Sequence, residues 1–77
     1  MDNYIIRKIV SKRGDKYNYK YLDKRKNEIM NKQIINDAKK KLYIPPAYDN
    51  VKINLCKSDN VLAIGYDTKD RPQYIYN

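Results

Sequence analysis

The stretch Val51–Tyr66, VKINLCKSDNVLAIGY, decides the fold because it contains two different strand patterns separated by a turn. Apolar and polar residues alternate over 51–56, which predicts a half-buried strand. The next four residues, 57–60, are all polar or charged and predict the turn. The run 61–66 is apolar on both faces, as expected of a strand inside a sheet. Gly65, near the end of that run, indicates a bulge or a close approach of neighbouring chain.

Two more strands are predicted upstream. Tyr4–Ser11 is β-branched and aromatic, and Lys12–Lys16 carries a turn signal. Tyr17–Leu22 then follows with a period of two. This period places three tyrosines on one face of the strand, where we expect a half-buried packing surface rather than a base-stacking platform: Tyr17, Tyr19 and Tyr21.

The middle of the chain predicts a helix. A short strand is expected at Glu28–Met30, after which Asn31 can cap a helix that runs to Leu42. An alternative N-cap at Asn27 would start the helix one turn earlier. Pro45 enforces a stop. The predicted helix has one apolar stripe, Ile34, Ile35, Ala38 and Leu42. Its last turn carries three cations that complement the helix dipole, Lys39, Lys40 and Lys41.

Short connections between the strands favour antiparallel pairing. Ile44–Tyr48, IPPAY, predicts a rigid extended connector, Asp67–Pro72 a loop, and Gln73–Tyr76 a last strand. We therefore expect an α+β fold, a small antiparallel sheet of five to six strands with one or two short helices packed on it. Residues 1–77 are expected to form a single domain.

Composition limits the possible functions. With no histidine and one cysteine, Cys56, the chain offers no ordinary zinc or copper site, no internal disulfide and no supported cysteine nucleophile. We therefore expect no metal, no cofactor and no catalytic residue. No apolar run approaches the roughly 20 residues of a membrane span, and no signal peptide is visible. The sequence thus predicts a soluble, intracellular protein without membrane association.

The net charge of +8 on 77 residues favours a polyanionic partner. Most of the cations are lysines, and more than half of the chain is Lys, Asn, Ile or Tyr. All four have AT-rich codons, so an AT-rich genome would account for part of the lysine count.

The last loop and strand carry the residue types that groove recognition needs. Lys69 and Arg71 lie in the predicted loop, where they can neutralise phosphates. Gln73 can pair with an adenine edge or donate to guanine. Tyr74 and Tyr76 share one face of the strand and offer flat rings and hydroxyl groups to bases or phosphates. These five residues are the candidate DNA-binding site.

Two separated motifs resemble a known family. Ile44–Tyr48 followed by Val51–Ile53, and then AIGYDTKDRPQYIY at Ala63–Tyr76, are similar to the N-terminal domain of the poxvirus-like type IB DNA topoisomerases of poxviruses, giant viruses and bacteria. The motifs cover a little under half of the chain, and Tyr19–Asp23 also resembles the family's second strand. Pro72 departs from the pattern because the family usually has Lys or Arg there.

The resemblance implies a DNA clamp. In this family the N-terminal domain closes over duplex DNA, and the strand that matches Gln73, Tyr74 and Tyr76 lies in the major groove over the cleavage site. The catalytic groups and the tyrosine that forms a 3′-phosphotyrosyl link belong to a C-terminal catalytic domain, which is absent from this chain. We therefore expect a monomeric, non-catalytic part of a DNA-relaxing isomerase, whose partners are double-stranded DNA and its own catalytic domain. A large DNA virus as the source would place it in the host cytoplasm or the virion.

Two other functions stay open from the residues alone. The tyrosine stripe and the lysine-rich helix end would also suit a protein-interaction module that docks an acidic partner. A small RNA-binding protein is compatible with the charge, although the chain lacks Phe, Trp and any RNA-binding signature.

Overall fold

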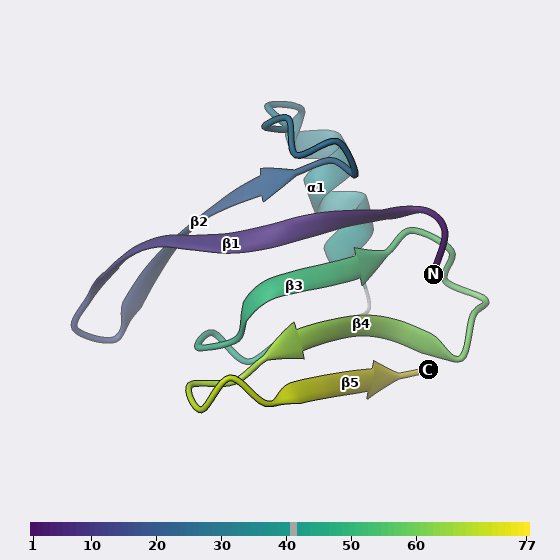
Figure 1. Ribbon diagram of the computed structural model, residues 1–77. Coiled ribbons are helices and arrows are strands. Elements are labelled where there is room, and N and C mark those ends of the chain that lie inside the picture. The colour runs from purple at the N-terminus through teal and green to yellow at the C-terminus, as the bar shows by residue number, and fades with distance from the viewer. Residues whose placement is uncertain (41) are drawn as a thin grey trace.

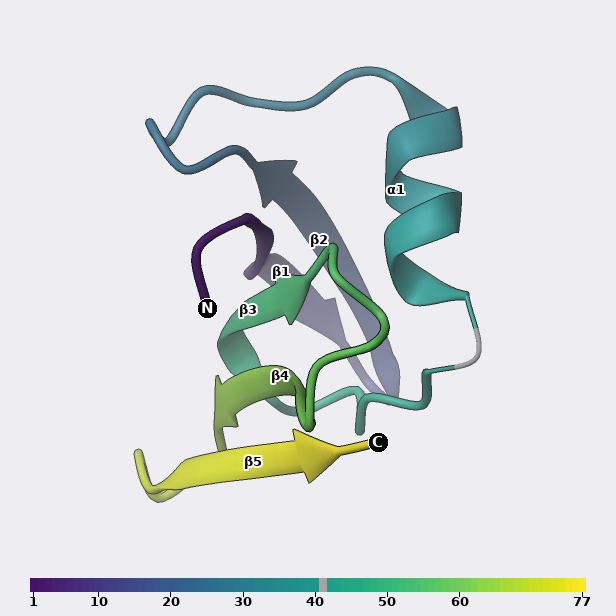
Figure 2. The same cartoon turned by 90° about the vertical axis from the view of Figure 1, so that its right-hand side faces the viewer.

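The fold is a twisted five-stranded antiparallel sheet with one helix on one side (Figures 1 and 2). The computed structural model describes residues 1–40 and 42–77. Neighbouring strands follow the order β2-β1-β3-β4-β5, and every pair is antiparallel. The elements are β1 (Tyr4–Arg13), β2 (Lys16–Leu22), α1 (Lys32–Lys39), β3 (Asp49–Asn54), β4 (Val61–Tyr66) and β5 (Pro72–Tyr76). The predicted α+β class is confirmed, with five strands and one helix in the described residues.

The short strand predicted at Glu28–Met30 is wrong. Glu28 makes a single bridge to Leu22 and no ladder. The carboxylate of Asp23 holds the preceding turn by accepting hydrogen bonds from two backbone N–H groups, those of Arg25 and Asn27. The helix cap follows three residues after Glu28, so the chain leaves the sheet edge after one bridge.

The helix begins where Asn31 predicts. Its side-chain oxygen accepts a hydrogen bond from the backbone N–H of Gln33 at 2.9 Å, which satisfies one of the free donors of the first turn. The predicted end at Leu42 is wrong, because the helix ends at Lys39 and Lys40 is already extended. Lys41, predicted in the last turn, lies outside the described residues. The early end lets Leu42 and Ile44 turn back onto the core.

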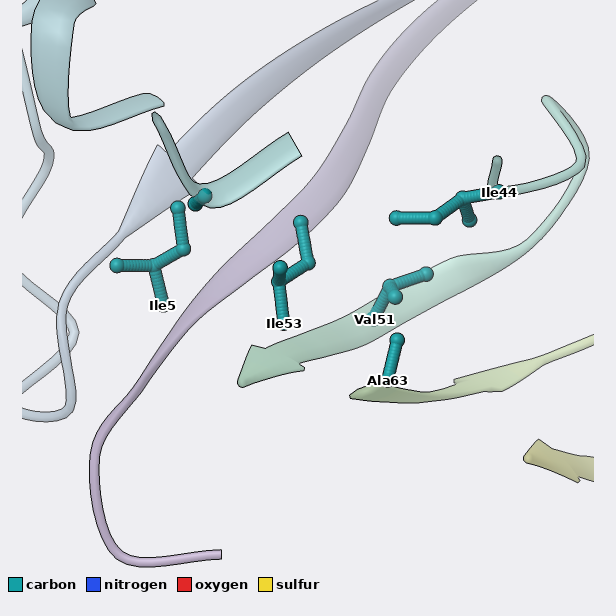
Figure 3. Packing of buried hydrophobic residues seen from close by; sticks show 6 residues of the cluster. Ile5, Ile44, Val51, Ile53 and Ala63 are labelled. Atoms are coloured by element: carbon teal, nitrogen blue, oxygen red, sulfur yellow. The ribbon is translucent and has the colours of Figure 1, made fainter. Parts of the chain in front are cut away.

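The core lies between the helix and the centre of the sheet (Figure 3). The two fully buried branched side chains of β3, Val51 and Ile53, form its middle. Ile5 of β1 and Ala63 of β4 flank them on the neighbouring strands. Ala38 of α1 and Ile44 of the connector close it from the helix side. The alternation in 51–56 therefore predicted the right face, and β4 has the interior position expected of it.

The strand predicted over 51–56 ends earlier, at Asn54. The side chain of this buried residue accepts a hydrogen bond from the backbone N–H of Cys56 at 2.9 Å and donates to the backbone carbonyl of Val61 at 2.9 Å. These bonds replace the ladder bonds that a longer strand would make, and they fix the turn between β3 and β4.

A buried arginine attaches the connector to the sheet. The Arg7 guanidinium donates to the carbonyl oxygens of Pro45 at 3.0 Å and Tyr48 at 2.9 Å, and it lies 4.2 Å from the ring centroid of Tyr19. Burial lowers the pKa of this group, and the neighbouring tyrosines partly oppose that effect. The connector, predicted to be extended, turns after Pro45, and the N–H of Tyr48 donates to the Pro45 carbonyl at 3.1 Å. A proline after the first residue of a turn favours this bend.

Both features expected at Gly65 are present. The β3–β4 register shifts by one residue opposite it, and the extra residue, Asn50, has a φ of 49°. A Cβ atom on Gly65 would lie 2.9 Å from Cγ2 of Val51 and 3.3 Å from the ring of Tyr48. The close approach therefore requires glycine at this position.

We expect Gly65→Ala to destabilise the domain by about 1–3 kcal/mol, because the new methyl group overpacks the core. Thermal or urea unfolding would measure it. The clash is with a Val51 methyl group, so in a double-mutant cycle Val51→Ala should recover part of the cost. Strict additivity of the two substitutions would contradict the steric explanation.

Candidate nucleic-acid interface

One carboxylate organises the loop between β4 and β5. Oδ1 of Asp67 accepts hydrogen bonds from the backbone N–H groups of Lys69 and Arg71, both at 2.9 Å. Oδ2 accepts from Nε of Arg71 at 2.9 Å and from Nε2 of Gln73 at 3.1 Å. The backbone closes the same turn, because the N–H of Asp70 donates to the Asp67 carbonyl and Asp70 has a φ of 59°. Asp67 therefore brings three of the five candidate residues together.

The ion pair leaves the arginine accessible. The side chain of Asp67 is 14% exposed, whereas that of Arg71 is 64% exposed. The hydrogen bond from the Arg71 backbone, followed by those from the Arg71 side chain and the Lys69 backbone, holds the pKa of Asp67 below its ordinary value of 3.8. Asp67 is therefore ionised at neutral pH, and it presents the guanidinium of Arg71 at the molecular surface.

The tyrosines form an exposed pair on β5. The rings of Tyr74 and Tyr76 stack with centroids 6.3 Å apart and planes 18° apart, and the residues are 51% and 65% exposed. Tyr74 lies directly opposite Ile64 of β4, and both point away from the helix. We call this side of the sheet the open face. Because β5 is an edge strand, the pair is reachable from the face and from the edge.

Gln73 points to the other side. It lies opposite Gly65, is half-buried and faces the helix side of the sheet, as the period of a strand predicts. Pro72 lies opposite Tyr66 at the first residue of this edge strand, a position where the missing N–H is tolerated. The structure thus places Tyr74 and Tyr76 together on the open face, and places Gln73 with the loop.

Asp67 was missed from the sequence as a site residue. The sequence feature that indicated it was an acidic residue at the start of a turn. Such a carboxylate can accept a hydrogen bond from the backbone N–H two residues later. That pattern predicts a local turn but gives no indication that Arg71 and Gln73 would share the same carboxylate.

The tyrosine stripe on β2 is a packing surface, as predicted. The hydroxyl of Tyr19 donates to the carbonyl of Pro46 at 2.7 Å, and Tyr21 packs against the core. Tyr17 stacks on Tyr19 with centroids 6.2 Å apart. All three tyrosines are half-buried.

Together, fold and site define a small basic α+β domain with an exposed tyrosine pair on its edge strand. A curated relative with a similar sequence is the DNA topoisomerase 1B of Acanthamoeba polyphaga mimivirus, which is 42% identical over 66 residues. The match covers 86% of this chain and 19% of the relative, so the chain spans about a fifth of that enzyme's length. The resemblance to type IB topoisomerases is therefore confirmed, and this chain is homologous to part of a giant-virus type IB topoisomerase. No family model matches the chain, and no solved structure matches it significantly.

The described residues contain neither a membrane-spanning helix nor a cluster of metal ligands. No helix within 1–40 and 42–77 is long and apolar enough to cross a membrane. The same residues contain no group of three or more His, Cys, Asp or Glu side chains that could hold a metal ion.

The depressed pKa of Asp67 predicts how the loop responds to acid. The hydrogen bonds favour the ionised carboxylate, so their contribution is complete above pH 3.8 and is lost as the pH falls through the lower folded value. NMR signals of the Arg71 Nε–H and the Gln73 side-chain amide should therefore be constant from pH 7 to about pH 4 and change only below it. Asp67→Asn at pH 7 should shift the same two signals towards their acid positions. A midpoint between pH 4 and pH 7 would contradict the assignment.

Proposed function

We propose that this chain is a duplex-DNA-binding domain of a type IB DNA topoisomerase, and that β5 contacts the major groove near the cleavage site. The observation that carries the proposal is the exposed, stacked pair of Tyr74 and Tyr76 beside the loop that Asp67 organises. Homology to a DNA topoisomerase 1B over most of the chain supports the same function.

The tyrosine pair suits a groove. A major groove about 12 Å wide admits a two-stranded β-ribbon, and β4–β5 is such a ribbon at the edge of the sheet. Two rings at consecutive positions of one face would follow the groove and present hydroxyl groups to bases or phosphates. Stacking of Tyr74 on Tyr76 restricts both rings before binding, which lowers the entropy lost on contact.

The loop would supply the phosphate contacts. Arg71 uses Nε for Asp67, and its exposed side chain can direct the remaining guanidinium nitrogens at a phosphate. Lys69 is exposed beside it and adds a second cation. These contacts are independent of sequence, so they would position the domain on the duplex.

Gln73 would read a base only from the strand edge. One N–H of its Nε2 donates to Asp67, which leaves the second N–H and the side-chain oxygen for a base edge. A bidentate contact with adenine uses the oxygen and one N–H, so the other N–H can keep the bond to Asp67. Entry of the β5 edge into the groove would let Gln73 and Tyr74 contact bases together, although they point to opposite faces.

In the complete enzyme, this domain would hold the duplex while a separate catalytic domain cleaves one strand, forms the 3′-phosphotyrosyl intermediate, allows rotation and reseals the nick. Neither the groove residues nor the phosphate residues proposed here would take part in bond making. Their effect would be to fix the duplex relative to the reacting phosphodiester.

The test is duplex binding by the 77-residue chain, measured by fluorescence anisotropy with labelled DNA at several salt concentrations. Wild-type affinity should fall with salt, with log K decreasing by about 0.9 per phosphate contact per log unit of salt. Tyr74→Ala and Tyr76→Ala should each weaken binding about tenfold, as expected for loss of one contact to a charged or base partner.

Tyr43→Ala is the matched control, since Tyr43 is 76% exposed and lies outside the sheet. It should leave affinity unchanged. If wild-type chain failed to bind duplex even at low salt, or if all three substitutions had equal effects, the proposed function would be wrong.

A further inference from the structure

The open face of the sheet contains a hollow whose charged side chains are all lysines. It has a volume of about 350 Å³ and lies between β1, β3 and the turn after β2. Lys8 of β1, Lys52 of β3, and Lys24 and Lys26 of the turn line it, and no carboxylate belongs to its lining. The only ion pair within residues 1–40 and 42–77 is that of Arg71 with Asp67, so none of the four lysines has such a partner there.

Two of these lysines make cation–π contacts with the same ring, that of Tyr4. The Nζ atoms of Lys52 and Lys24 lie 5.2 Å and 5.8 Å from the ring centroid of Tyr4. Lys24 also donates to the backbone carbonyl of Asp2. Cation–π contact orients an ammonium group without neutralising its charge. The two cations therefore remain available to an anion.

The arrangement is unfavourable for an isolated domain. Lys8 lies directly opposite Lys20 on β2, and like charges at directly opposed positions destabilise a strand pair. Concentrating further lysines around the same hollow adds to the repulsion. Bound anionic groups would relieve it.

The register connects this hollow to the tyrosine pair. Lys52 lies opposite Ile64, and Ile64 lies opposite Tyr74, so the three occupy one row across β3, β4 and β5. Adjacent strands are about 4.8 Å apart, which places the backbone of Lys52 about 10 Å from that of Tyr74. This spacing is close to the roughly 12 Å width of the major groove.

We propose that the lysine hollow binds the phosphodiester backbone of the DNA strand that borders the groove in which Tyr74 and Tyr76 lie. The proposal rests on the proposed function and extends the interface from the edge strand across the open face to β1. The hollow accepts phosphates of the duplex, whereas β5 contacts the groove itself.

The test compares two charge-matched double variants of the 77-residue chain in the salt-dependent anisotropy assay. Lys8→Gln with Lys52→Gln removes two charges from the hollow. Lys32→Gln with Lys40→Gln removes two exposed charges, one from α1 and one from its C-cap, on the other side of the sheet. The hollow variant should lower the slope of log K against log salt by about 1.8, or 0.9 per lost contact, and the helix variant should leave it unchanged.

The hollow variant should also keep or raise the melting temperature, because it removes like-charge repulsion.

Lys8→Arg with Lys52→Arg keeps both charges and should retain the wild-type slope, which separates loss of contacts from loss of folding. An unchanged slope in the hollow variant, an equal fall in both glutamine variants, or a reduced slope in the arginine variant would overturn the proposal. If the wild-type chain binds and only the Tyr74 and Tyr76 variants lose affinity, phosphate binding by the hollow is wrong and the proposed groove contact of β5 still holds. If wild-type chain does not bind duplex, the proposed function fails, and this proposal with it.

Discussion

The burial of Arg7 is the constraint on which the rest of the structure depends. A buried guanidinium is costly unless its donors are satisfied, and two donors meet the carbonyl oxygens of Pro45 and Tyr48 while the plane lies over the ring of Tyr19. Within the described residues, its Nε is the one buried side-chain polar atom without a partner. The connector must therefore bend across the sheet at this point.

That bend determines how closely the elements pack. It places the ring of Tyr48 against Gly65, beside the fully buried Val51, and so fixes the end of β4. The loop held by Asp67 starts two residues after Gly65. The position of the proposed DNA-contacting residues is thus linked through β4 to an arginine three strands away from β5.

The sequence predicted those parts of the fold that local chemistry controls. Period-two alternation located β2 and β3, runs of β-branched, aromatic or apolar residues located β1 and β4, and Asn31 located the start of the helix, because these signals act within a few residues. The helix end, the single bridge at Glu28 and the bend after Pro45 were not predictable in this way. Each depends on a contact with residues far along the chain, such as the packing of Ile44 in the core or the hydrogen bonds of Arg7.

In the candidate site, too, the features set by local geometry were predictable and those set by a loop conformation or by distant contacts were not. The opposite orientations of Gln73 and Tyr74 follow from the two-residue period of a strand. The sharing of Asp67 by Arg71 and Gln73 requires a particular loop conformation. The lysine hollow could not be predicted, because Lys8, Lys24 and Lys52 come together only when β1 lies between β2 and β3.

The central position of β1 also affects the time at which the domain can form. β1 is synthesised before β3, one of its two neighbours in the sheet, and the Arg7–Tyr48 contact joins residues 41 apart in the chain. At about 5–20 residues per second, translation needs several seconds to supply that partner. Until then, β1 has only its hairpin with β2, and an isolated hairpin is marginally stable in water. The guanidinium of Arg7 therefore stays hydrated until the connector has been synthesised, and its burial coincides with closure of the sheet.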